Sequence, residues 1–130
     1  MIDLKYLIYS YIVGDSYGLS RLGNDKLDSM NLEYNDELNI EKGYFSSMTS
    51  FMLATMDSIS KCKSIEPIDI LNKMCTSLIL GKYTNNGKIY ALDKETINIL
   101  EYYRKKNNLN YDYKIHDLTS YSISRLIPII

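Results

Sequence analysis

The side chains of this 130-residue chain that could do chemistry are mostly carboxylates, and their spacing forms no evident pair. Asp15 follows Gly14, where a carboxylate either ligates a cation or accepts hydrogen bonds from nearby backbone N–H groups. Asp57 falls away from the apolar face of its helix, which predicts a solvated side chain. A cluster of loop acids lacks EF-hand spacing and is typical of a soluble surface: Glu33, Asp36, Glu37 and Glu41.

Nucleophiles with a recognisable partner are missing as well. The single histidine, His116, argues against a His-based metal site and against a nucleophile–His pair. The hydroxyl-rich run 46–50 has no base near it, and a helix start capped by Ser46 or Ser47 explains it better. Both cysteines lie in helix-like sequence beside apolar neighbours, which predicts two buried, reduced thiols: Cys62 and Cys75. Taken alone, these residues support no enzyme.

A basic segment with interleaved aromatic side chains has the composition of a stacking surface for nucleic acid. Its members are Tyr102, Tyr103, Arg104, Lys105, Lys106, Tyr111 and Tyr113. A helix C-terminus with solvated lysines explains the same residues, and the net charge of −1 gives the whole chain no basic footprint. Direct contact with nucleic acid therefore stays an alternative, and an acidic protein surface or the phosphates of a guide RNA would also fit this segment.

The elements that position these residues are predicted to be helices, because the dominant apolar period is helical. A first helix of about four turns is expected to end at Gly14 and Gly18, and a polar connection follows over 20–44. Further helices are predicted at about 47–61, at 67–80 between Pro67 and a stop at Gly81, after an Asp93 cap, and from about 117. The fold class is all-α: residues 1–130 form a single small bundle of about five short helices with long connections.

Apolar stripes at helical spacing predict which faces turn inward. The first helix presents Leu4, Leu7, Ile8, Tyr11 and Ile12; the second presents Met48, Phe51, Met52, Met56 and Ile59. The third presents Ile68, Leu71, Cys75 and Leu78; the fourth presents Thr96, Ile97, Leu100 and Tyr103. No apolar run approaches the ~20 residues of a membrane span, and the N-terminus lacks a signal-peptide pattern. We therefore expect a cytoplasmic protein without membrane contact.

Five segments, in order across nearly the whole chain, resemble motifs of the ADP-ribosylglycohydrolase family. Residues 12–18 resemble its opening G-D-A-x-G helix, and residues 43–54 are similar to its G-x-x-T-D-D-T-x-M-x-L-A helix start. Residues 81–87 are similar to G-x-Y-x-x-x-G, residues 96–100 lie where T-T-x-x-A-L would, and residues 120–129 resemble N-G-S-x-M-R-x-x-P-I. The resemblance implies an all-α fold that hydrolyses ADP-ribose from modified side chains with two divalent cations, commonly magnesium or manganese.

The same resemblance shows which functional residues are replaced. The metal-ligating Thr-Asp-Asp falls on Ser46, Ser47 and Met48, so both carboxylates are lost, and a thioether does not replace an anionic oxygen on a hard cation. Tyr121 stands in the loop where a glycine would admit ADP-ribose. The family's second acidic cluster belongs to a C-terminal half that this chain does not match. The motif residues that remain are Gly14, Asp15, Gly18, Ser46, Thr49, Ser122, Arg125 and Pro128.

These departures predict a truncated pseudo-enzyme without a cofactor, which works by binding a larger protein or ribonucleoprotein complex. A phage or mobile-element inhibitor of a bacterial defence complex, such as a CRISPR effector, fits this description. The alternative is a vestigial protein that binds ADP-ribose or a nucleotide, or a weak ADP-ribosyl hydrolase. The apolar C-terminus is a further candidate interaction surface, to be covered by local repacking, by self-association or by a partner: Ile127, Ile129 and Ile130.

Overall fold

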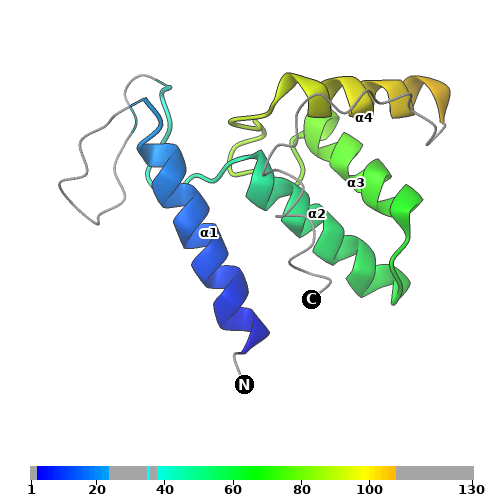
Figure 1. Cartoon of the computed structure of the whole chain (residues 1–130), viewed down its shortest axis with the longest axis horizontal. Coiled ribbons are helices and arrows are strands. Elements are labelled where there is room, and N and C mark those ends of the chain that lie inside the picture. Colours follow the sequence, from blue (N-terminus) through cyan, green and yellow to red (C-terminus); the bar gives the residue numbers. More distant parts are fainter. Residues whose placement is uncertain (1–2, 24–34, 36–37, 108–130) are drawn as a thin grey trace.

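The computed structural model describes residues 3–23, 35 and 38–107, and within them the chain is all-α, as predicted. The helices are α1 (Leu4–Ser20), α2 (Ser47–Cys62), α3 (Pro67–Leu80) and α4 (Lys94–Lys106). α2 and α3 form an antiparallel hairpin, α4 packs on α3, and α1 stands on the other side of α2 (Figure 1). The helix predicted from residue 117 lies outside the described residues. No helix in the described ranges has both the length and the apolarity that crossing a membrane requires.

Local capping explains where most of these helices begin and end. The Asp93 carboxylate accepts a hydrogen bond from the Thr96 backbone N–H at 2.8 Å, so it is the N-cap predicted for α4. Pro67 is the first residue of α3, where its missing N–H costs nothing. Gly81 ends α3 in the left-handed conformation, with φ of 64°. All three boundaries follow from residue type alone.

The expectation that Gly14 and Gly18 end the first helix is wrong. α1 continues through both glycines to Ser20, and both are exposed on its surface. Arg21 is the C-cap of the helix, and a side chain from the following connection binds the last carbonyl groups. The Asn35 amide nitrogen donates to the carbonyls of Ser20 at 3.3 Å and Leu22 at 2.9 Å, so it satisfies carbonyl groups at the C-terminal end of the helix.

Asn35 is itself held in place by a short backbone bridge. It is 4% exposed, and its N–H and C=O exchange hydrogen bonds with Ile40 at 2.9 and 3.0 Å. Its side-chain oxygen accepts from the Leu38 N–H at 3.0 Å. The amide group is therefore bonded at both ends, which a buried asparagine requires. Nothing in the sequence pattern singled out this residue.

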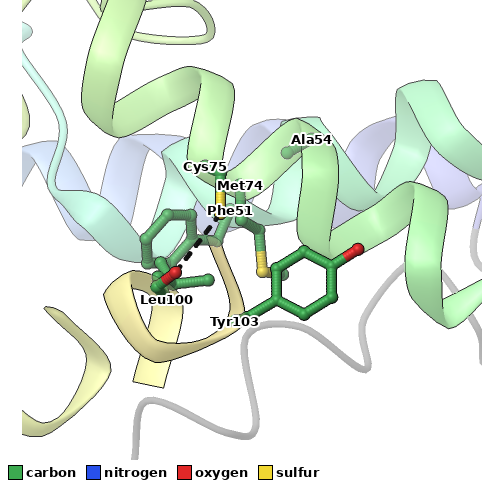
Figure 2. Close-up of a cluster of buried hydrophobic side chains, with 6 residues drawn as sticks. All are labelled: Phe51, Ala54, Met74, Cys75, Leu100 and Tyr103. Carbon is green, nitrogen blue, oxygen red and sulfur yellow. Dashed lines mark hydrogen bonds between the residues drawn. The ribbon is translucent and has the colours of Figure 1, made fainter. Parts of the chain in front are cut away.

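The core lies between α2, α3 and α4. Its fully buried members are Phe51, Ala54, Met74, Cys75, Leu100 and Tyr103 (Figure 2). The Cys75 thiol donates to the Leu100 carbonyl at 3.7 Å, which ties α3 to α4 within the cluster. Three residues predicted to face inward are exposed instead: Ile68 of α3 is 56% exposed, and Leu4 and Leu7 of α1 are 52% and 43% exposed.

The inward face of α2 is richer in hydroxyls than the apolar pattern predicts. Phe51 and Met52 are buried as expected, but three other predicted members are only half-buried: Met48, Met56 and Ile59. Five hydroxyl side chains are at most 1% exposed: Ser47, Thr49, Ser50, Thr55 and Ser58. Two of them donate to carbonyls four residues back, as Thr55 does to Phe51 at 2.9 Å. A hydroxyl that is satisfied within its own helix can be buried at little cost.

The prediction that both cysteines are buried is correct for one of them and wrong for the other. Cys75 is buried, and that burial raises the pKa of its thiol. Cys62 is exposed at the last turn of α2, where the helix has left the core, so the expectation of a buried thiol is wrong there.

Two substitutions separate backbone strain from steric contact in this fold. Gly81→Ala places a Cβ at a left-handed residue and against the Gly87 backbone, whereas the same change at Gly43, with φ of 81°, meets open space. We expect Gly43→Ala to lower the free energy of unfolding by about 1–2 kcal/mol and Gly81→Ala by at least about 3 kcal/mol. Urea denaturation followed by circular dichroism measures both, and equal losses would contradict the close approach of Gly81 to Gly87.

Candidate functional site

The Asp15 carboxylate of α1 lies at the N-terminus of α2 and binds it with both oxygens. One oxygen, Oδ1, accepts from the Ser46 hydroxyl at 2.6 Å. The other, Oδ2, accepts from the backbone N–H groups of Ser46 at 3.0 Å and Thr49 at 3.3 Å, and from the Thr49 hydroxyl at 2.5 Å. A negative charge is stabilised at this end of a helix. Of the two readings that the sequence leaves open for Asp15, the geometry supports the bond to nearby donors.

Ser46 and Ser47 are also committed to the scaffold. The Ser46 hydroxyl, besides donating to Asp15, accepts from the Met48 N–H at 3.1 Å, so Ser46 is the N-cap of α2. Ser47 is fully buried; its hydroxyl donates to the Ala91 carbonyl at 3.0 Å, and its N–H donates to the Tyr90 carbonyl at 2.8 Å. These bonds join the start of α2 to α1 on one side and to the connection before α4 on the other.

The donors at these positions do not fit a pair of divalent cations. Ser46, Ser47 and Met48 offer two hydroxyls and a thioether, and Asp15 supplies one carboxylate whose oxygens already accept four hydrogen bonds. Hard cations take six or more oxygen ligands, several of them anionic. The described residues contain no group of three or more His, Cys, Asp or Glu side chains that could hold a metal ion.

A second polar cluster joins α2, α3 and the connection before α4. The Asp57 carboxylate accepts from the Tyr83 hydroxyl at 2.6 Å and lies 3.0 Å from the Lys61 ammonium and 3.5 Å from that of Lys73. These contacts lower the pKa of Asp57 from 3.8 to about 2, the Tyr83 hydrogen bond contributing most. The prediction of a solvated Asp57 holds only in part: its side chain is 25% exposed, but residues distant in sequence bind its carboxylate.

Lys73 links this carboxylate to a second one. Its ammonium lies 3.1 Å from Asp69, which also accepts from the Ser58 hydroxyl at 2.6 Å. The Ser58 hydrogen bond, followed by that of Lys73, lowers the pKa of Asp69, and the bond to Asp69 raises the pKa of Lys73. Ser58 is fully buried. The exposed Cys62 thiol also donates to Asp69, at 3.6 Å. The geometry of the cluster is that of a polar tie between helices.

The predicted basic surface is only partly present. Arg104, Lys105 and Lys106 are exposed at the end of α4, as expected. Tyr103 is only 5% exposed and donates its hydroxyl to Asn72 at 3.1 Å, so its predicted place on the inward stripe is confirmed and its predicted place on the basic surface is wrong. It faces inward because it follows Thr96 and Leu100 on the buried side of the helix. Tyr102 is half-buried.

Other predicted site residues lie apart from the Asp15 site or outside the described residues. Gly14 and Gly18 are exposed on α1, with nothing within 4 Å of a Cβ built on either. Outside the described residues lie Tyr111, Tyr113, Tyr121, Ser122, Arg125, Ile127, Pro128, Ile129 and Ile130. The same is true of His116 and of Glu33, Asp36 and Glu37 among the loop acids.

Comparisons of the chain with family models, curated proteins and solved structures found no match. The relationship to ADP-ribosylglycohydrolases therefore stays a prediction from the motif segments. Two of those segments do meet in space, since the Gly-Asp pair of α1 contacts the start of α2 through Asp15, Ser46 and Thr49.

Removing the Asp15 carboxylate tests its structural role. Asp15→Ala leaves two N–H groups and two hydroxyls of α2 without their acceptor, so we expect a loss of about 2–4 kcal/mol in the free energy of unfolding. Asp3→Ala is the matched control, because Asp3 caps the exposed start of α1 with a single bond to the Lys5 N–H, and removing such a cap costs about 0.5–1 kcal/mol. Similar losses for both variants would contradict the account.

The lowered pKa values of Asp57 and Asp69 predict acid sensitivity. The unfolded chain binds protons near the ordinary pKa of 3.8, whereas folded Asp57 does so near 2. Their contribution to stability is therefore present above about pH 4 and is lost as the pH falls toward 2. Urea unfolding across this range should give a shallower pH slope for Asp57→Asn. The exposed Glu41→Gln should keep the slope of the unaltered chain, and an unchanged slope in Asp57→Asn would contradict the assignment.

Proposed function

We propose that this chain is a non-catalytic module that binds a larger protein through α1. The observation that carries the proposal is the exposure of large apolar side chains along the first three turns of this helix. Tyr6 is 69% exposed and Val13 58%, and three further residues are more than two-fifths exposed: Leu4, Leu7 and Tyr9. Exposed large apolar side chains concentrated on one element are typical of protein interfaces.

The exposed side chains of α1 lie on opposite sides of the helix. At 100° per residue, Tyr6, Tyr9 and Val13 share one side, and Leu4 and Leu7 lie opposite. A helix that is apolar all round is usually enclosed by other elements. α1 buries only Ser16, Leu19 and Ser20, all at its C-terminal end.

Charge also favours an apolar partner surface. The only charged side chains of α1 are Lys5 and Asp15, and the Asp15 carboxylate is turned to α2. A helix of this composition fits an apolar groove, in which burial of each large side chain contributes on the order of 1–2 kcal/mol. The proposal therefore commits to a partner that offers such a groove.

The Asp15 site supports binding without catalysis. Its carboxylate occupies the N-terminus of α2, which is where a phosphate of ADP-ribose would be attracted. A second anion at this point would be repelled. The geometry therefore favours a protein-binding role over the nucleotide-binding alternative.

Among protein-binding roles, we favour an inhibitor of a larger bacterial defence complex, such as a CRISPR effector, encoded by a phage or mobile element. A small chain with one helix available for docking is suited to tight, stoichiometric binding of a larger assembly. Under this proposal, the chain shares the helical fold of ADP-ribosylglycohydrolases and lacks their hydrolase activity.

Site-specific crosslinking tests this function. The photoreactive residue p-benzoylphenylalanine replaces Tyr9 on α1 or, as the matched control, Ser60 on the exposed side of α2. In bacterial lysate we expect a single larger adduct from the Tyr9 position and none from the Ser60 position. The partner is then purified and its affinity measured by calorimetry. Tyr6→Lys and Val13→Lys should each weaken binding by about tenfold, and Ser60→Lys should leave the affinity unchanged.

Three outcomes would contradict the proposal. Equal adducts from both positions would remove α1 as the binding surface, and an adduct with the mass of two chains would replace the larger partner by a second copy. If the chain releases ADP-ribose from a mono-ADP-ribosylated protein in the presence of Mg²⁺ or Mn²⁺, the proposal that it is non-catalytic would be overturned.

A further inference from the structure

A pocket opens between α3 and α4, on helices that α1 does not contact closely. It has a volume of about 260 Å³. Its walls are mostly apolar and come from Leu78 and Ile79 on α3 and from Ile97 and Leu100 on α4. Cys75, whose place beside Leu100 is visible in Figure 2, also contributes to the lining.

The size and shape of this pocket favour a side chain as its occupant. Pockets that enclose drug-sized ligands have volumes of roughly 300–1,000 Å³, whereas this one is smaller and open to solvent. Ile79 is 56% exposed at its edge, so the apolar surface continues outward from the pocket. Such a cavity receives one or two large apolar side chains that project from a longer segment.

The mouth of the pocket carries one charge of each sign, because Glu101 and Arg104 both line it. The Glu101 carboxylate lies 3.6 Å from the Lys105 ammonium, which offsets its charge. No described carboxylate pairs with the exposed Arg104. Arg104 is therefore the charged group at the mouth that can pair with a carboxylate beside the apolar side chain of a partner.

We propose that the α3–α4 pocket receives an apolar side chain from an acidic amphipathic segment of a partner protein, with Arg104 pairing the adjacent carboxylate. The inference rests on the proposed function, since it assumes that the chain acts by binding protein, and it names a second contact and its chemistry. It also gives the basic end of α4 a role that does not require nucleic acid.

The test uses the full chain and two synthetic peptides. One carries leucines at positions i, i+3 and i+7 with flanking glutamates, and the other has lysines in place of the glutamates. Binding is followed by the methyl NMR signals of Ile79 and Ile97, which line the pocket, with the buried Ile40, outside both α1 and the pocket, as the reference. We expect saturable shifts of the two pocket signals with the glutamate peptide, and binding of the lysine peptide weaker by about tenfold.

Charge reversal at the mouth provides the matched variants. Arg104→Glu should invert the preference between the two peptides, whereas Lys82→Glu, at an exposed residue that does not line the pocket, should leave it unchanged. Both residues are exposed, so neither change should disturb folding. The inference would be overturned if neither peptide shifts Ile79 and Ile97 at millimolar concentration, or if both bind equally and Arg104→Glu has no effect.

Two further outcomes distinguish failure of the pocket inference from failure of the proposed function. Saturation of the same signals by 4-phenylbutyrate, at a lower concentration than by the glutamate peptide, would replace the peptide by a small carboxylate ligand and overturn the inference. Loss of peptide binding alongside intact crosslinking from α1 would overturn the pocket alone and leave the proposed function standing.

Discussion

The carboxylate of Asp15 is the contact on which the arrangement of this molecule depends. It joins the middle of α1 to the first turn of α2, and four donors converge on its two oxygens. Ser47 then fastens the same turn of α2 to the connection before α4. The buried residues of α1 lie at its C-terminal end, and its first turns stand apart from the other described helices (Figure 1).

The contacts of Asp15 also explain why we propose that this residue serves the fold and not a catalytic reaction. In the motif that residues 12–18 resemble, a carboxylate next to glycine belongs to a metal-dependent hydrolase; here the same residue type completes a helix N-terminus. Once both oxygens of Asp15 are used by Ser46 and Thr49, a cation would have to displace several hydrogen bonds to reach them. Within the described residues, exposed apolar side chains are found on α1 and at the α3–α4 pocket, the two surfaces for which we propose protein partners.

Sequence reasoning succeeded where the cause is local and failed where it is distant. Asp93 and Gly81 act on backbone groups within a few residues, so their roles were predictable from residue type. Asn35 binds a carbonyl at the end of α1 from fifteen positions away, and Tyr83 donates to Asp57 across 26 positions, so no periodicity reveals either. The buried hydroxyl face of α2 was missed for a related reason: the apolar period counts a serine as polar even when its own helix supplies the acceptor.

The central claim is that the Asp15 carboxylate serves the fold and does not meet a ligand. The most direct measurement is the ¹³C chemical shift of this carboxyl group, assigned with Asp15→Asn, during titration of the folded chain with MgCl₂ and then with ADP-ribose. Because both oxygens are bonded to the start of α2, the account predicts that the signal does not move with either ligand. A saturable shift of the Asp15 signal, with the chain still folded, would contradict it.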